Sequence, residues 1–252
     1  MKHFRPRLSR RAFWVLCALL VCLRLALTGF QQAYIWVGGA PLDDELMFRA
    51  ANHITAGQWL GAYDYLTLSK AMFFPVWLAL LHALHLPYLI SGAALWCGAA
   101  LLAAFAFSTL WRKKDPAQGR VLTLGLFAAL AFLPSSWAAY TLRVYRDNIF
   151  PALCLYFFAG MAGMALRAVF APEKPLWPWL AAAGAGLACG YLDREDAGLF
   201  LLPFAAAATV IVAVVLAGKR RWKALAAQVI PYVMLGVGVL TFMFPGLDWT
   251  WQ

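Results

Sequence analysis

Charged residues are scarce in this chain. Only 13% of its 252 residues are Asp, Glu, Lys or Arg, whereas 64% are hydrophobic. A soluble domain typically carries about 25% charged residues, and one globular core cannot hide this much apolar surface. The scarcity excludes a soluble globular protein and leaves no segment for a separate soluble domain. Apolar runs of about twenty residues, the length that a membrane span requires, recur along the whole sequence.

Patterns of several other protein classes are also missing. The five cysteines all lie in apolar runs and none forms a CxxC pair, which argues against a disulfide framework or a zinc site. The net charge of +10 has no base-reading motif beside it, so nucleic acid is not an expected partner. The basic residues instead form short blocks between apolar runs, where they act as topology signals and contacts for anionic lipids. The first apolar stretch lacks an A-x-A cleavage pattern and contains Arg24, which favours an uncleaved span over a signal peptide.

The apolar runs predict an all-α polytopic transmembrane helix bundle, with residues 1–252 forming a single membrane domain. The stretch 72–86 is too short for a span and contains His82 and His85. We expect it to form a juxtamembrane or re-entrant helix within an outer loop of residues 31–89. The odd number of spans and the end of the chain just after the last one predict an N-terminal portion of a longer protein. The seven predicted spans are residues 12–30, 90–110, 121–139, 149–168, 177–192, 198–217 and 224–244.

The distribution of basic residues predicts the orientation. With the N-terminus in the cytoplasm, fifteen of the 21 Lys and Arg residues fall on the inner side, five fall on the outer side, and Arg24 lies within the first span. This agrees with the positive-inside rule and predicts an integral inner (cytoplasmic) membrane protein. Nine of the eleven acidic residues fall on the outer side. Acids contribute little to orientation, so topology alone does not explain their position.

The first cluster of charge is Asp43 to Glu45, at the start of a segment in which apolar residues recur at helical spacing from Leu42 to Ile54. The spacing predicts an amphipathic helix on the membrane surface. Acids in a first helical turn complement the helix dipole. Adjacent carboxylates can also bind a divalent cation or act as a general base, and the spacing does not choose between these roles.

Two further clusters place cations on the outer side. Lys70 precedes the apolar stretch 72–86, where it either anchors the helix at the interface or holds a lipid phosphate. Arg143 and Arg146 oppose the charge bias, and a guanidinium group is suited to phosphate. An internal salt bridge to an outer acid is the alternative for these arginines.

A fourth cluster, Asp193-Arg194-Glu195-Asp196, joins two predicted spans through almost no loop. Four charges between apolar helices are costly unless they are paired or used. We expect Arg194 to pair with one neighbour and Glu195 or Asp196 to remain free. His82 and His85 stand three residues apart, but two histidines without a third ligand give little support for a metal site.

Together these clusters resemble the polyprenyl-phosphate-sugar-dependent membrane glycosyltransferases of the GT-C fold, in particular the bacterial protein-mannosyltransferase-like and lipid A arabinose-transferase-like branch. The resemblance runs from about Arg11 to Phe204. It consists of the acidic pair at the start of a surface helix, a Lys before a Pro-containing apolar helix (Lys70 to Pro75), an arginine-bearing outer loop, and an Arg-acid motif before another span. Family members often have Gly-Pro after the Lys, where this chain has Ala71-Met72, and they are usually longer.

The resemblance implies an enzyme that moves a sugar from a polyprenyl phosphate donor to an acceptor on the outer, periplasmic or extracellular, face of the membrane. It implies that Asp44 or Asp43 is the catalytic acid or base. It also implies donor binding by Lys70, Arg143 and Arg146, with Arg194 and Glu195 as further substrate-binding residues. Two alternatives stay open: a non-catalytic membrane subunit or fragment, and a transporter or flippase of a lipid-linked substrate. Membrane lipids are expected partners in every case.

Overall fold

The computed structural model describes residues 7–35, 42–59, 61, 70–111, 115–171 and 174–247, and it is helical with no strand in that part of the chain. The predicted all-α class is therefore confirmed. The α-helices are α1 (Arg10–Gly29), α2 (Leu42–Thr55), α3 (Phe73–Ala83), α4 (Tyr88–Ser108), α5 (Pro116–Ala131), α6 (Ala139–Leu142), α7 (Phe150–Phe170), α8 (Trp177–Asp193), α9 (Gly198–Gly218), α10 (Trp222–Ala226) and α11 (Ile230–Leu247). Short 3-10 turns lie at Pro134–Trp137, Arg146–Asn148, Glu195–Ala197 and Ala227–Val229.

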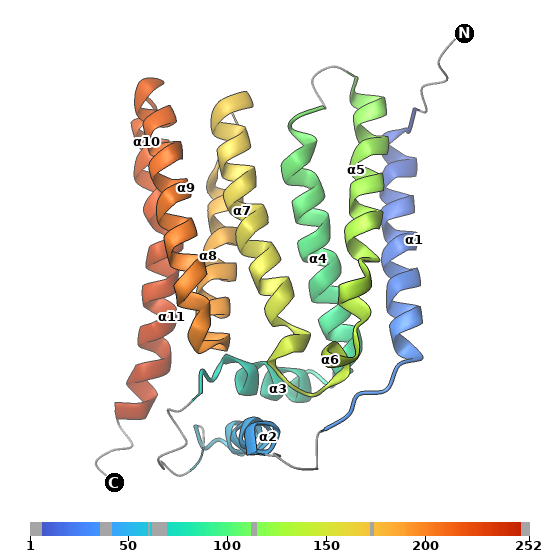
Figure 1. The fold of residues 1–252 in the computed structure, drawn as a ribbon, viewed down its shortest axis with the longest axis vertical. Helices are drawn as coiled ribbons and strands as arrows, with labels where there is room; N and C mark the ends of the chain where they lie inside the picture. Colours follow the sequence, from blue (N-terminus) through green and yellow to red (C-terminus); the bar gives the residue numbers. More distant parts are fainter. Residues whose placement is uncertain are drawn as a thin grey trace.

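Five helical segments in the described part of the chain are long and apolar enough to cross a membrane. They coincide with five of the seven predicted spans. The predicted spans at 121–139 and 177–192 correspond to α5 and α8, which have only 16 and 17 residues. Both nevertheless lie alongside the longer helices, α5 between α1 and α4 and α8 beside α7 (Figure 1). The long segments are Arg10–Gly29, Tyr88–Ser108, Phe150–Phe170, Glu195–Gly218 and Trp222–Thr241.

The bounds of α5 differ from the predicted span of 121–139. The helix begins at Pro116 because Asp115 caps it: one carboxylate oxygen accepts from the backbone N–H groups of Ala117, at 2.9 Å, and Gln118, at 3.2 Å. Proline suits the first helical turn since its missing N–H has no partner there. The helix ends at Ala131, and a 3-10 turn starting at Pro134 follows. Residues 132–139 are therefore a connection and not part of a span.

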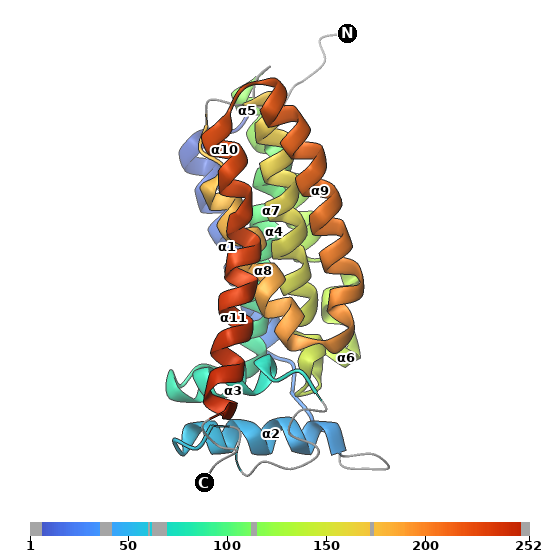
Figure 2. The ribbon, with the colours of Figure 1, turned by 90° about the vertical axis from the view of Figure 1, so that its left-hand side faces the viewer.

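The long helices run roughly parallel, and α2 and α3 lie across one end of the bundle (Figures 1 and 2). We call this end, with α2, α3 and residues 132–149 and 194–197, the loop end. The opposite end, with residues 7–11, 109–111, 115–120, 174–176 and 219–221, is the basic end. There the N–H of Leu8 donates to the carbonyl of Ala117, and Lys219 Nζ donates to the carbonyl of Ala168. The short helix expected at 72–86 is thus α3, and it lies across the end of the bundle.

Small residues let α7 and α8 approach each other closely. A Cβ atom added at Gly160 would lie 2.5 Å from the backbone nitrogen of Ala183, and one added at Gly163 or Gly186 would also collide with the facing helix. Such close backbone contact is a common way for helices to associate in lipid, where the hydrophobic effect does not drive them together. The α7–α8 pair therefore forms the centre of the bundle, and Phe157 and Leu187 are fully buried within it.

The outward faces of the bundle are apolar. Large hydrophobic side chains that are more than half exposed include Leu19 on α1, Val210 and Ile211 on α9, and Val233 and Val237 on α11. Exposed apolar surface of this extent is unfavourable in water but suits contact with lipid chains. The surface thus agrees with the composition of the chain.

Candidate functional site

The loop end of the bundle brings the four predicted charge clusters together. They come from the start of α2, the segment before α3, the connection between α6 and α7, and the connection between α8 and α9. We call the set the charge network; its members are Asp43, Asp44, Lys70, Arg143, Tyr145, Arg146, Asp147, Arg194, Glu195 and Asp196. All seven predicted site residues lie within it.

The amphipathic helix predicted from residue 42 is confirmed as α2, and its packing separates the two adjacent aspartates. Met47 and Ala51, three and seven residues after Asp44 and so on its face of the helix, are buried, and Met47 packs in a cluster with Phe74 of α3. Since neighbouring residues on a helix point about 100° apart, Asp43 lies at the edge of this face and not at its centre. The Asp44 side chain is fully buried, whereas the Asp43 side chain is 39% exposed.

Asp44 forms a bidentate ion pair with Arg143. The Nε of Arg143 donates to Asp44 Oδ2 at 2.8 Å, and its Nη2 donates to Oδ1. This hydrogen bonding raises the pKa of Arg143. The backbone around Arg143 is fixed by a bridge to Tyr34, in which Val144 N–H donates to the Tyr34 carbonyl at 2.9 Å. The pair ties α2 to the connection before α7.

Asp43 lies at one end of a chain of polar contacts. Lys70 Nζ is 3.3 Å from Asp43 Oδ2, and the Tyr145 hydroxyl donates to the same oxygen at 3.1 Å. Arg146 Nη2 in turn donates to the Tyr145 hydroxyl at 2.6 Å. Burial raises the pKa of Tyr145, so its hydroxyl keeps the proton that it donates. Asp43 is therefore a half-exposed carboxylate that contacts one cation directly and a second through a phenol.

Arg146 joins the connection before α7 to the end of α8. Its side chain is only 5% exposed, and Nη1 donates to Glu195 Oε2 at 2.7 Å and to the backbone carbonyl of Asp193 at 3.2 Å. The second oxygen of Glu195 accepts from Ala71 N–H at 2.6 Å, which fixes the residue after Lys70. The Nε of Arg146 is buried and has no hydrogen-bond partner in the described part of the chain.

Arg194 contacts two acids, so the expectation that Glu195 or Asp196 stays free is wrong. Its Nη1 donates to Asp147 Oδ1 at 3.0 Å and its Nε donates to Asp196 Oδ1 at 3.1 Å. Glu195 meanwhile pairs with Arg146. Local pairing was expected from the sequence, but the partner from another connection was not, because nothing in the spacing indicates that residues 147 and 194 are neighbours.

Sequence reasoning did not select Asp193 or Tyr145 as site residues. Asp193 is completely buried at the end of α8, and neither carboxylate oxygen has a hydrogen-bond partner among the described residues. Burial raises the pKa of this carboxyl well above its ordinary value. The signal in the sequence was the absence of a loop between two apolar runs, which forces at least one of four consecutive polar residues into the packed interior.

The predicted arginines thus adopt the salt-bridge alternative, Arg143 with Asp44 and Arg146 with Glu195. Asp43 contacts Lys70 and Asp44 contacts Arg143, so the two carboxylates do not converge on one point. The pair therefore does not fit a divalent cation. No cluster of three or more His, Cys, Asp or Glu among the described residues has the arrangement of a metal site. His82 and His85 stack on each other, with ring centroids 6.4 Å apart, outside the charge network.

No family model matches the chain, and neither a curated protein nor a solved structure is similar enough to match it. Some residues of the predicted outer loop, including Asp64 and the stretch 62–69 before Lys70, lie outside the described residues, as does Asp248.

Proposed function

We propose that this chain is a membrane glycosyltransferase, or the N-terminal portion of one, that moves a sugar from a polyprenyl phosphate donor to an acceptor on the outer face of the membrane. In this proposal the seven predicted segments, α5 and α8 included, cross the membrane and the basic end is cytoplasmic. The observation that carries it is the half-exposed Asp43 carboxylate, held 3.3 Å from Lys70 and linked through Tyr145 to Arg146 at the end of an apolar bundle.

The arrangement suits the transfer of a phosphate-linked sugar. The acceptor hydroxyl attacks the anomeric carbon, and Asp43 takes the proton of that hydroxyl. The bond between the anomeric carbon and the phosphate oxygen breaks, and the electron pair leaves with the polyprenyl phosphate. In this proposal Lys70 directly, and Arg146 through the Tyr145 hydroxyl, stabilise the charge that develops on the phosphate. The donor is already activated, so positioning, a base and cations are sufficient.

The two aspartates have different roles in this proposal. Asp44 is fully buried and engaged by Arg143 on both oxygens, so we assign it the positioning of α2. The Asp43 side chain is 39% exposed and contacts Lys70 at 3.3 Å, so we assign it the role of base. Glu195 and Arg194 position Arg146 and Asp147 and hold the segment that carries Lys70.

The donor site is tested by identifying the lipid that copurifies with the protein. The full chain is purified in mild detergent and its bound lipid is extracted for mass spectrometry, beside an Arg143→Ala/Arg146→Ala variant. An Arg10→Ala/Arg11→Ala variant, which removes two exposed cations at the basic end, is the matched control. We expect a polyprenyl phosphate or its sugar adduct with the wild type and the control, and its loss from the loop-end variant.

Ordinary phospholipids alone in all three samples would contradict donor binding and favour the non-catalytic subunit or fragment. Movement of a lipid-linked sugar across sealed vesicles without any transfer would favour the transporter. Transporters typically hold their substrates near the middle of the bilayer, whereas the charge network of this chain lies at one end of the bundle.

A further inference from the structure

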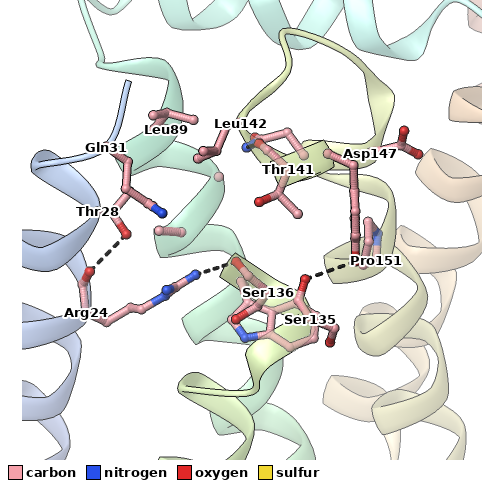
Figure 3. Close-up of a pocket in the computed structure, with 15 residues that line it drawn as sticks. Arg24, Thr28, Gln31, Leu89, Ser135, Ser136, Thr141, Leu142, Asp147 and Pro151 are labelled. Carbon is pink, nitrogen blue, oxygen red and sulfur yellow. Dashed lines mark hydrogen bonds between the residues drawn. The ribbon is translucent and has the colours of Figure 1, made fainter. Parts of the chain in front are cut away.

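A small polar cavity lies inside the bundle beside the charge network, with which it shares Asp147. It opens between α1, the start of α4, the turn after α5 and the start of α7, and its volume is about 50 Å³. A water molecule needs only about 10–15 Å³ by this measure, so the cavity has room for a small polyatomic group. Figure 3 shows Arg24, Thr28 and Gln31 on one side of it and Ser135, Ser136 and Thr141 on the other.

Arg24 is the buried cation of this cavity. It lies within α1, five residues before the end of that helix at the loop end, and it is 3% exposed. Nη2 donates to the Ser136 carbonyl at 2.8 Å, and the guanidinium stacks 3.4 Å from the ring centroid of Trp137. Its Nε and Nη1 atoms are buried and have no hydrogen-bond partner in the described part of the chain. A guanidinium left in this state inside a membrane protein is costly.

The nearby carboxylate does not offset this charge. Asp147 also lines the cavity, but its Oδ1 accepts from Arg194, and Figure 3 shows the two residues Arg24 and Asp147 on opposite sides. The cavity also contains a buried acceptor without a partner, Asn148 Oδ1, whose amide nitrogen donates to the Thr141 carbonyl at 2.8 Å. The buried groups that lack a hydrogen-bond partner among the described residues are therefore two donors of the Arg24 guanidinium, Nε and Nη1, and one acceptor, Asn148 Oδ1.

We propose that this cavity binds a phosphate group, with Arg24 donating from Nε and Nη1 to its oxygens and Asn148 accepting from a hydroxyl beside it. A guanidinium fork matches phosphate oxygens in geometry and charge. The phosphate comes either from a lipid headgroup entering at the loop end or from free inorganic phosphate. The site is separate from the donor site proposed above and does not depend on glycosyl transfer.

The test measures anion binding by the full chain, delipidated in dodecyl maltoside. Thermal unfolding is followed while dioleoyl phosphatidylglycerol or inorganic phosphate is titrated, with dioleoylglycerol as the lipid that lacks a phosphate. We expect saturable stabilisation of the wild type and roughly tenfold or more weaker binding by Arg24→Gln, because the lost hydrogen bonds are charge-assisted. The control Arg11→Gln removes an exposed charge from the same helix and should bind as the wild type does.

The arms separate the two sources of phosphate. Stabilisation by phosphatidylglycerol alone identifies a headgroup site, and stabilisation by both probes identifies a site for the phosphate itself. No saturable effect of either probe on the wild type, or the same effect on Arg24→Gln, overturns the proposal.

A second variant keeps the test decisive if Arg24→Gln does not fold. Gln31→Glu places a carboxylate in the cavity while keeping Arg24. We expect a higher melting temperature without added anion and weaker binding of both probes, since the cavity then holds its own counter-charge. Unchanged anion binding in this variant would argue against the site. The Arg143→Ala/Arg146→Ala variant separates this site from the proposed donor site if it binds phosphate as the wild type does but no longer copurifies with the donor.

Discussion

Adjacent residues at the start of α2 have opposite environments. The Asp44 side chain is fully buried against Arg143, whereas the Asp43 side chain is 39% exposed and contacts Lys70 and Tyr145. The helical period contributes to the difference, because it turns the two carboxylates about 100° apart and leaves Asp43 at the edge of the buried face. Substitutions at these two positions should therefore have different consequences.

Asp43→Asn should abolish most transfer and leave the fold intact. The amide cannot take the acceptor proton, and loss of a general base typically lowers rates by about 10²–10⁴-fold. The measurement is sugar transfer from a polyprenyl phosphate donor to an envelope acceptor fraction, with the melting temperature recorded in parallel. Full turnover by this variant would exclude Asp43 as the base.

Asp44→Asn should instead act on stability. It leaves Arg143 without its carboxylate in a mostly buried position, a change that costs about 1–3 kcal/mol, and it loosens the start of α2. We expect a lower melting temperature than for Asp43→Asn, measured in the same detergent. Equal stability of the two variants would show that the ion pair between Asp44 and Arg143 does not hold α2.

Asp193 should make stability depend on pH. In the unfolded chain the pKa of Asp193 is near the ordinary Asp value of about 4. In the folded protein burial raises the pKa of this carboxyl. The folded state then holds a proton that the unfolded state releases. The contribution to stability is therefore greatest below the unfolded pKa and is lost as the pH rises toward the folded pKa.

Asp193→Asn removes this titration while keeping the shape of the side chain. Its melting temperature relative to the wild type should rise as the pH is raised from about 5 to about 8. The difference between the two proteins is the measurement, because all other groups titrate in both. A constant difference across this range would show that the carboxyl is not held in its neutral form.

At the scale of elements, the contact between α7 and α8 depends on the absence of side chains. Gly160→Ala should be destabilising by about 1–3 kcal/mol, the usual cost of overpacking, because its Cβ meets the backbone of α8. Gly125→Ala on α5 is the control, since nothing lies within 4 Å of its Cβ position. Thermal unfolding of both variants checks the contrast, and a similar melting temperature for the two would mean that α7 and α8 can separate without loss.

At the scale of the whole molecule, the proposed seven-span topology would place the loop end and the basic end on opposite sides of a membrane. Single cysteines at Glu45→Cys on α2 and Lys174→Cys at the basic end, both exposed positions, test this in a Cys22→Ser background. A membrane-impermeant maleimide should label the first from outside intact spheroplasts and the second only in inverted vesicles. Labelling of both from one side would rule out this topology.

The sequence by itself determined the all-α class, the five long apolar helical segments and the amphipathic helix α2. These follow from composition and from periodicity within a segment, which are local properties of the chain. It also singled out seven charged residues that the structure brings together at the loop end, since charges between apolar runs are conspicuous. The predicted end of the span at 139 was wrong because the effect of Pro134 on α5 was not recognised.

Only the tertiary structure decided which charges pair. Arg143 with Asp44, Arg146 with Glu195, and Arg194 with Asp147 are each separated by tens of residues, and no pattern in the sequence encodes the distance between them. The same holds for Arg24, whose cavity is formed by four segments that meet only in the folded bundle. Periodicity within one helix fixes which face a residue occupies, but the partner on that face depends on how the helices pack.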